Sequence, residues 1–232
     1  MKVSQKKLKI NVTVEVETNG YNELGAGTDK KKSVSAPCCV KGVSMKAVCI
    51  VGSARSDGST AYLVDTIRKG MESVGIETVR YSIGEANLHF CTGCKTCYED
   101  GKCIWKDDVE TIVSDLFDAD FVVIAAPSYW AEVPGQLKVF FDRSTPYGDT
   151  NPSRRLWRKK PAKGIAIAVR AGSHEEENVQ ILNSIAHYYG HLGIETVERV
   201  SVCRVDTLKD LLSGHQEEID RVYRIGAGLL EC

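Results

Sequence analysis

Hydrophobic and polar positions follow two alternating patterns along the chain from Met45 onward. Short and nearly continuous apolar runs, such as "KAVCIVG" and "FVVIAAP", are typical of strands buried on both faces of a parallel sheet. Similar runs recur at regular intervals between longer amphipathic segments. The pattern predicts five strands, at residues 46–52, 76–83, 121–127, 164–170 and 194–202.

The segments between these runs have the period of an amphipathic helix. In the first of them Leu63, Ile67 and Met71 fall on one face, and Gly75 follows as a stop signal. The second begins at an Asp-Asp pair, and either aspartate can cap a helix. The predicted helices cover residues 59–75, 107–120, 134–143, 175–193 and 208–230.

Strands that alternate with helices form a parallel sheet that is covered on both faces. Five strands in this part of the chain predict a flavodoxin-like, doubly wound α/β fold at residues 45–232. Such folds bind ligands where the carboxyl ends of the strands meet. The chemistry is therefore expected in the loops that follow Gly52, Ile83, Ala126 and Val169.

Residues 1–44 have a different texture and are predicted to form an extension to this domain. Residues 8–16 alternate strictly between apolar and polar, which predicts a half-buried strand. It could join the edge of a sheet in this chain or in a partner, and a poorly ordered tail is the alternative. The following stretch is rich in Gly, Ser, Asp and Lys, as linkers are.

Composition narrows the function classes. Hydrophobic residues make up 43% and charged residues 26% of the chain, and the net charge is −1. No global field therefore draws the chain to nucleic acid or to an anionic membrane. The N-terminus lacks a signal-like apolar region, and the longest apolar runs are too short to cross a bilayer. A cytoplasmic protein is expected, and its nine cysteines then suggest metal or redox chemistry rather than disulfides.

The loop after the first strand reads "GSARSDGST". It lacks both the GxGxxG dinucleotide pattern and the GK[ST] of a P-loop. It nevertheless places hydroxyls, the cation of Arg55 and a flexible Gly58 just before a helix N-terminus, where unpaired N–H groups favour an anion. These features predict a phosphate cradle, and an ordinary capped turn is the alternative.

The loop after the third strand reads "PSYWAEVPGQ" and carries two large aromatics, Tyr129 and Trp130. Aromatic side chains at the active edge suit stacking on a planar ring. The alternative is that Trp130 packs on the following helix or at a subunit interface.

Together the two loops resemble those of the NADPH-dependent FMN reductase group. The resemblance implies that Ser53, Arg55, Ser59 and Thr60 hold the FMN phosphate, with Asp57 and Gly58 in the same loop. It implies that the ring is lined by Pro127, Ser128, Tyr129 and Trp130. A third wall would include Ala171 and Gly172, although "RAGSHEEEN" has a single glycine where relatives are glycine-rich.

Four cysteines lie within the thirteen residues "CTGCKTCYEDGKC", at positions 91, 94, 97 and 103. Zinc ribbons use two separate C-x2-C pairs, so this spacing is atypical for zinc. C-x2-C-x2-C is the run with which bacterial ferredoxins bind three corners of a [4Fe–4S] cluster, but the fourth cysteine here follows after five residues and without proline. A cluster is favoured, and zinc or free thiols are the alternatives.

This cysteine motif between the two loops resembles the iron–sulfur flavoprotein family, over residues 46–202. The resemblance implies that Cys91, Cys94, Cys97 and Cys103 ligate a [4Fe–4S] cluster and that FMN lies at the strand ends. It further implies homodimers or homotetramers that transfer electrons from ferredoxin-like proteins or NAD(P)H. Because the reactive chemistry belongs to the cofactors, we expect no catalytic side chain. Two other functions stay open: an NAD(P)H-dependent FMN or quinone reductase without a cluster, and an electron carrier without a small-molecule substrate.

Overall fold

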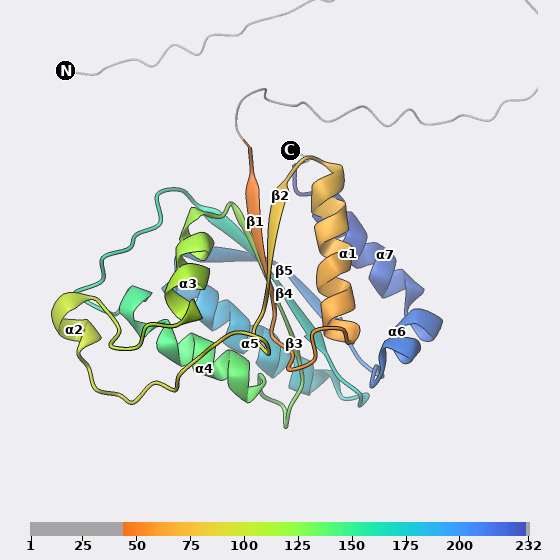
Figure 1. Ribbon diagram of the computed structural model, residues 1–232. Coiled ribbons are helices and arrows are strands. Elements are labelled where there is room, and N and C mark those ends of the chain that lie inside the picture. The colour runs from red at the N-terminus through yellow and green to blue at the C-terminus, as the bar shows by residue number, and fades with distance from the viewer. Residues whose placement is uncertain (1–43, 231–232) are drawn as a thin grey trace, which may run out of the picture. The chain divides into compact units, whose positions relative to one another are not determined.

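The computed structural model describes residues 44–230 and builds them around one five-stranded sheet. Every strand pairs with its neighbours in parallel, in the order β2-β1-β3-β4-β5 (Figure 1). This is the doubly wound order, so the predicted flavodoxin-like α/β fold is confirmed. The strands are β1 (Lys46–Val51), β2 (Glu77–Ser82), β3 (Phe121–Pro127), β4 (Ala162–Val169) and β5 (Ile194–Val202). The strand predicted at residues 8–16 lies outside the described residues.

Helices cover both faces of the sheet (Figure 1). One face carries α1 (Ser59–Ser73), α6 (Leu208–Gly214) and α7 (Gln216–Ala227), and the other carries α3 (Asp108–Asp118), α4 (Gly135–Arg143) and α5 (Glu175–His191). A short helix, α2 (Cys97–Asp100), and a 3-10 turn, η1 (Thr145–Tyr147), were not apparent in the sequence pattern.

The strands alternate their side chains between two hydrophobic cores, one under each helical layer. In β1, Val48 and Ile50 belong to one core, while Cys49 and Val51 belong to the other. Each of the four side chains is fully buried. Burial raises the pKa of the Cys49 thiol to about 12, so this cysteine acts as a small apolar core residue.

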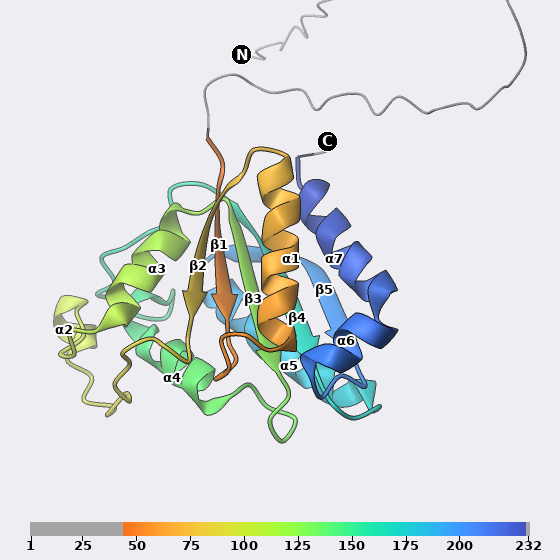
Figure 2. The same cartoon turned by 45° about the vertical axis from the view of Figure 1, so that its right-hand side comes forward.

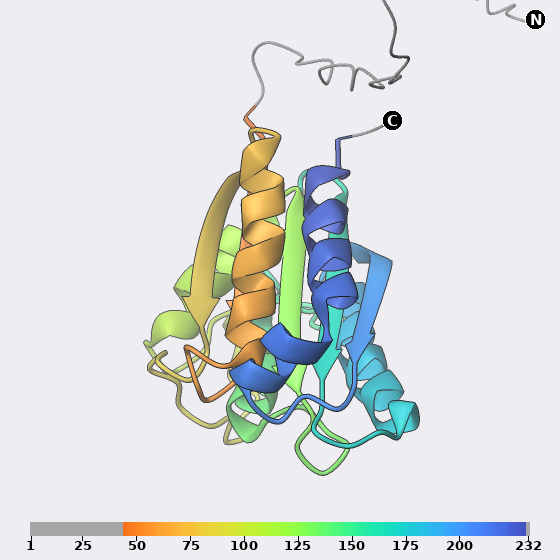
Figure 3. The ribbon, with the colours of Figure 1, turned by 90° about the vertical axis from the view of Figure 1, so that its right-hand side faces the viewer.

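The single closing helix predicted at residues 208–230 was wrong, because the chain divides it at His215. The backbone of His215 leaves the helical region, with φ −131° and ψ 37°. A capping box between Thr207 and Asp210 starts α6, and α7 begins anew after the break. The turn lets α7 lie along α1 (Figure 3). Gly214, just before the break, was a stop signal that the amphipathic pattern concealed.

The α1–α7 contact is close enough to bring backbone against backbone. A Cβ on Gly70 would lie 2.3 Å from the carbonyl oxygen of Tyr223, and one on Gly226 would lie 2.3 Å from that of Ile67. Both glycines are therefore required by packing rather than by their dihedral angles.

We expect Gly70→Ala to lower the free energy of unfolding by about 1–3 kcal/mol, because its methyl group would force α7 away from α1. Gly190→Ala is the matched control: Gly190 lies within α5 and a Cβ there meets nothing within 4 Å. That change should leave stability unchanged or raise it by up to about 1 kcal/mol. Urea denaturation of both variants measures the difference, and equal effects would contradict this account of the contact.

Candidate functional site

A depression opens where the carboxyl ends of β1, β3 and β4 meet. Loops that follow four of the strands line it, as expected at this edge of a doubly wound fold. The β1 loop contributes Ser53, Arg55 and Gly58 together with the first residues of α1, Ser59 and Thr60. The β3 loop contributes Pro127, Ser128 and Tyr129, the β4 loop contributes Arg170 and Ala171, and the loop after β5 contributes Val205 and the one carboxylate, Asp206. Of the residues predicted for this site, Asp57, Trp130 and Gly172 do not line the depression.

The β1 loop is held tightly against its neighbours. The Gly52 N–H donates to the Ala125 carbonyl at 2.7 Å, and a Cβ on Gly52 would lie 2.6 Å from Leu137. Arg80 donates to the Ser56 carbonyl at 2.8 Å, and the Ser53 hydroxyl accepts from the Arg55 N–H at 3.1 Å. The loop is thus preorganised by contacts from β2, β3 and α4.

The N-terminus of α1 offers unused hydrogen-bond donors to the depression. Its N-cap, Gly58, supplies no side-chain hydrogen bond, and the first backbone bond runs from the Tyr62 N–H to the Gly58 carbonyl. The earlier N–H groups of the first turn therefore lack intrahelical acceptors. The Ser59 hydroxyl is buried and has no hydrogen-bond partner. A phosphate bound here would satisfy all of these donors, so the residues fit the phosphate of FMN.

Arg170 adds a second cation that sequence reasoning had not assigned to the site. Its side chain is only 10% exposed, forms an ion pair with Glu177 at 3.0 Å and has a buried Nε without a partner. Glu177 also accepts from the Ser128 hydroxyl at 3.4 Å, which ties the β4 loop to the β3 loop. The signal was present in the sequence, since Arg170 directly follows the apolar run of β4.

The aromatic pair in the β3 loop is divided by a tight hairpin. Backbone bonds between Tyr129 and Glu132 close a two-residue turn, whose central residues, Trp130 and Ala131, have φ values of 55° and 62°. Such a turn favours Gly or Asn, so these non-glycine residues are strained there. Tyr129 faces the depression, whereas Trp130 is 100% exposed and packs neither there nor on α4.

The four cysteines line one small cavity, which they share with Trp105 and Arg143. Three positive φ angles, at Gly93, Lys95 and Gly101, turn the chain back on itself around this cavity. The segment leaves the carboxyl end of β2 and lies on the side of the sheet that carries α3 and α4 (Figure 2). The four thiols are thus brought to one cavity by local turns of the backbone rather than by one regular helix or strand.

The surroundings of the four thiols shift the pKa values of two of them, Cys97 and Cys94. Burial raises the pKa of Cys97, and the neighbouring thiolates of Cys103 and Cys94 raise it further. Hydrogen bonds with Thr96 lower the pKa of Cys94. Within residues 44–230, no three His, Cys, Asp or Glu side chains converge on a point that could bind a single metal ion. A [4Fe–4S] cluster presents separate iron corners to separate thiolates, and four thiols that line one cavity are the donor set that such a cluster requires.

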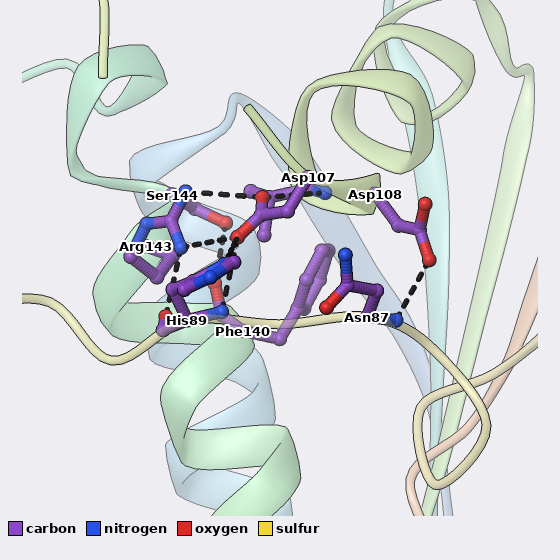
Figure 4. A network of polar contacts seen from close by, with 8 residues as sticks. Asn87, His89, Asp107, Asp108, Phe140, Arg143 and Ser144 are labelled. Carbon is purple, nitrogen blue, oxygen red and sulfur yellow. Dashed lines mark hydrogen bonds and ion pairs between the residues drawn. The ribbon is translucent and has the colours of Figure 1, made fainter. Parts of the chain in front are cut away.

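Asp107 connects both ends of the cysteine segment to α4 (Figure 4). Its carboxylate accepts from both terminal nitrogens of Arg143, at 2.6 and 3.0 Å, and from the His89 N–H at 3.0 Å. It also caps α3 by accepting from the Val109 N–H at 3.3 Å. The side chains of Asp107 and Arg143 are only 1% and 2% exposed.

A second layer of contacts supports the same network. Arg143 donates to the His89 carbonyl at 2.7 Å, and the His89 ring stacks on Trp105 with ring centroids 4.3 Å apart. Burial acts to raise the pKa of Asp107, but hydrogen bonds from Arg143 and His89 outweigh it and lower that pKa to about 2. Sequence reasoning had treated Asp107 as a helix cap and had given Arg143 no role.

Among the described residues, no helix is both long enough and apolar enough to cross a bilayer.

Comparison with known proteins shows the family to which the chain belongs. A family model described as NADPH-dependent FMN reductase matches residues 45–200. An iron-sulfur flavoprotein of Methanocaldococcus jannaschii is 39% identical over 142 residues, which cover 60% of this chain and 70% of that protein. An iron-sulfur flavoprotein of Archaeoglobus fulgidus is 34% identical over 132 residues, 57% of this chain and 58% of its own length.

Solved structures agree with the fold. An NAD(P)H:quinone oxidoreductase from Methanothermobacter marburgensis superposes with a TM-score of 0.61 at 14% identity, covering 81% of this chain and 98% of that one. A flavone reductase gives a TM-score of 0.61 at 16% identity, covering 81% and 62%. At these identities the likeness concerns the architecture alone.

We expect Asp107→Asn to lower the free energy of unfolding at neutral pH by about 3 kcal/mol, since it leaves Arg143 as a buried, unpaired charge. The native carboxylate has a pKa of about 2 against an ordinary value of 3.8. Its ionised form therefore stabilises the native state above pH ~4, by about 2 kcal/mol, and this contribution is lost as pH falls toward ~2.

The stability gap between the parent chain and Asp107→Asn should consequently narrow on acidification from pH ~5 to ~2 in urea unfolding. Asp108→Asn is the matched control, because Asp108 is exposed and accepts a single bond from the Asn87 N–H at 2.7 Å. A gap that stays constant with pH would contradict the assignment to Asp107.

Proposed function

The chain belongs to the NADPH-dependent FMN reductase family, and to the iron-sulfur flavoproteins within it, and on that premise we propose that it is a redox flavoprotein with FMN and a [4Fe–4S] cluster. It would be a flavin-dependent oxidoreductase that passes electrons between a reduced donor and an acceptor. The observation that carries the proposal is the pairing of a donor-rich depression with a four-cysteine cavity, in loops that leave the same edge of one sheet.

When bound, FMN would supply one- and two-electron chemistry and the cluster one-electron chemistry. The protein's contribution is binding and orientation. Ser53, Arg55, Ser59 and Thr60 would hold the phosphate, with Arg170 adding positive charge. Pro127, Ser128, Tyr129 and Ala171 would line the rest of the flavin site.

Cys91, Cys94, Cys97 and Cys103 would ligate the cluster. Burial and then the charges of Cys103 and Cys94 raise the pKa of Cys97, and a cationic cluster core would offset both effects. The Asp107–Arg143 pair would keep the segment docked on α4 while the thiolates are bound.

For partners we propose NAD(P)H or a ferredoxin-like protein as electron donor, with assembly of the chain into a homodimer or homotetramer. Trp130, fully exposed at the tip of its hairpin, offers a large aromatic surface for such a contact, since aromatic side chains are enriched at protein interfaces. A cluster-free NAD(P)H-dependent FMN or quinone reductase is the second candidate, and the metal content of the protein separates the two.

Protein purified without oxygen should contain flavin, about four irons and about four sulfides per chain. We expect Cys97→Ser to lose the iron and sulfide but to keep the FMN, because the cysteine cavity and the depression share no residue. Cys203→Ser is the control and should keep both groups, since Cys203 lines neither site. Flavin without iron in the parent protein would favour the cluster-free reductase, and zinc without iron would overturn the electron-transfer proposal.

Ser59→Ala should weaken FMN binding about tenfold or more, because a buried hydroxyl that bonds a charged phosphate contributes at least about 1.5 kcal/mol. Ser56→Ala is the matched control: Ser56 lies in the same loop but does not line the depression. Fluorescence titration of the flavin-free protein with FMN measures both affinities. Equal affinity in the Ser59 variant and the parent would place the phosphate elsewhere.

A further inference from the structure

We propose that Arg143 is a positioning residue for the cysteine cavity. Its side chain holds a fixed positive charge and an unused N–H against Cys103. It thereby raises the reduction potential of the group that the cysteines bind. The inference rests on the proposed function, because it concerns the [4Fe–4S] cluster. It assigns a role to a side chain that no cysteine motif includes.

The position of the Arg143 side chain is set by its neighbours rather than by its own flexibility. As the last residue of α4 it is buried, and both terminal nitrogens are engaged by Asp107 and by the His89 carbonyl. A guanidinium that is bound in this bidentate way cannot rotate without breaking two charge-assisted bonds. The charge is therefore fixed in place before any cofactor arrives.

Two of the five N–H donors of Arg143 are left over. Nη1 donates to Asp107 and to the His89 carbonyl, whereas Nη2 donates only to Asp107, so one N–H of Nη2 stays unused. The Nε is buried and is the one nitrogen of the guanidinium without any hydrogen-bond partner. A buried donor without an acceptor is unfavourable, and a native structure that retains one usually reserves it for a ligand or for a function.

The geometry directs this leftover donor to the cysteines. Arg143 lines the cavity that all four cysteines share, and it also lines an adjoining cavity of about 230 Å³. Cys103 is the one cysteine that lines both. Burial acts to lower the pKa of Arg143, but the hydrogen-bonded Asp107 and then the charge of Cys103 raise it.

A donor and a positive charge beside a ligating sulfur favour the more negatively charged, reduced state of an iron–sulfur cluster. Other charges near Arg143 are less able to do so. Asp107 is negative, and it compensates part of the charge from the opposite edge of the guanidinium. Lys95 lines the cysteine cavity, and Lys102, Lys106 and Arg155 line the adjoining one, but all four are exposed to solvent, which screens them. Asp142 also lines the cysteine cavity, and its charge is paired with Lys138.

The test is the one-electron reduction potential of the holoprotein, measured by redox titration with electron paramagnetic resonance. We expect Arg143→Met to lower the potential by an amount equal to at least a tenfold change in the ratio of oxidised to reduced cluster, about 59 mV. Arg143→Lys keeps the charge but loses the Nε–H, and its potential should fall between those of Arg143→Met and the parent. Lys69→Met is the control, an exposed cation on α1, on the other face of the sheet and outside both cavities, and should leave the potential unchanged.

A second variant separates this role from a merely structural one. Asp107→Asn removes the compensating negative charge but keeps Arg143, so the potential should rise, opposite to the effect of Arg143→Met. If Arg143→Met does not fold or does not keep its iron, Arg143→Lys and Asp107→Asn still decide the matter, with circular dichroism and iron content as controls for folding and loading.

The two possible failures are distinct. A parent protein without iron and sulfide would overturn both the proposed function and this inference. A parent protein with its cluster, whose Arg143 variants have the same potential as Lys69→Met, would overturn this inference alone. Shifts of the same sign in Asp107→Asn and Arg143→Met would likewise overturn it, because they would indicate a general disturbance of the cavity.

Discussion

The buried ion pair between Asp107 and Arg143 is the contact on which the arrangement of the cysteine segment depends. Between the end of β2 and the start of α3 the chain forms only one four-residue helix, so regular hydrogen bonding contributes little to its position. Asp107 fixes the segment instead. Its carboxylate caps α3, accepts a hydrogen bond from the His89 N–H and forms an ion pair with Arg143, the last residue of α4. Both ends of the segment that carries the four thiols are thereby attached to the folded core.

The depression at β1, β3 and β4 is organised by a different principle. Here the parallel strands themselves bring the loops together, because their carboxyl ends all lie along one edge of the sheet. The side chains that face the depression are mainly donors and cations, and some of them, including the Ser59 hydroxyl and Arg170 Nε, have no partner in the protein. Unused donors at a preorganised edge are what an anionic ligand requires. The molecule thus combines a site built by topology with one held by a single ion pair.

Sequence reasoning recovered most of the fold because its signals are local. Five apolar runs matched five strands, and the parallel order followed from their alternation with helices. The two errors in the predicted helices, the undivided helix at residues 208–230 and the missed α2, concern features that an amphipathic period does not show. The break at His215 follows Gly214, a stop signal that the amphipathic pattern concealed, and α2 is too short to show such a pattern. Likewise, Tyr129 and Trp130 look equivalent in sequence, but a two-residue turn sends only Tyr129 to the depression.

The sequence by itself determined which residues are candidates for the chemistry: four closely spaced cysteines, and hydroxyls with a cation before a helix. Side-chain identity and spacing are sufficient for that, because the kinds of ligand that thiols and N–H or O–H donors bind follow from their chemical type, whereas the pKa of each thiol depends on where the fold places it. Only the tertiary structure decided which distant groups join them. Arg143 lies 40 residues beyond Cys103 in the chain, and Arg170 lies further still, so no local pattern connects them to either site. The roles proposed for them rest on burial and on N–H groups that have no partner in the protein, which are properties of the packed chain alone.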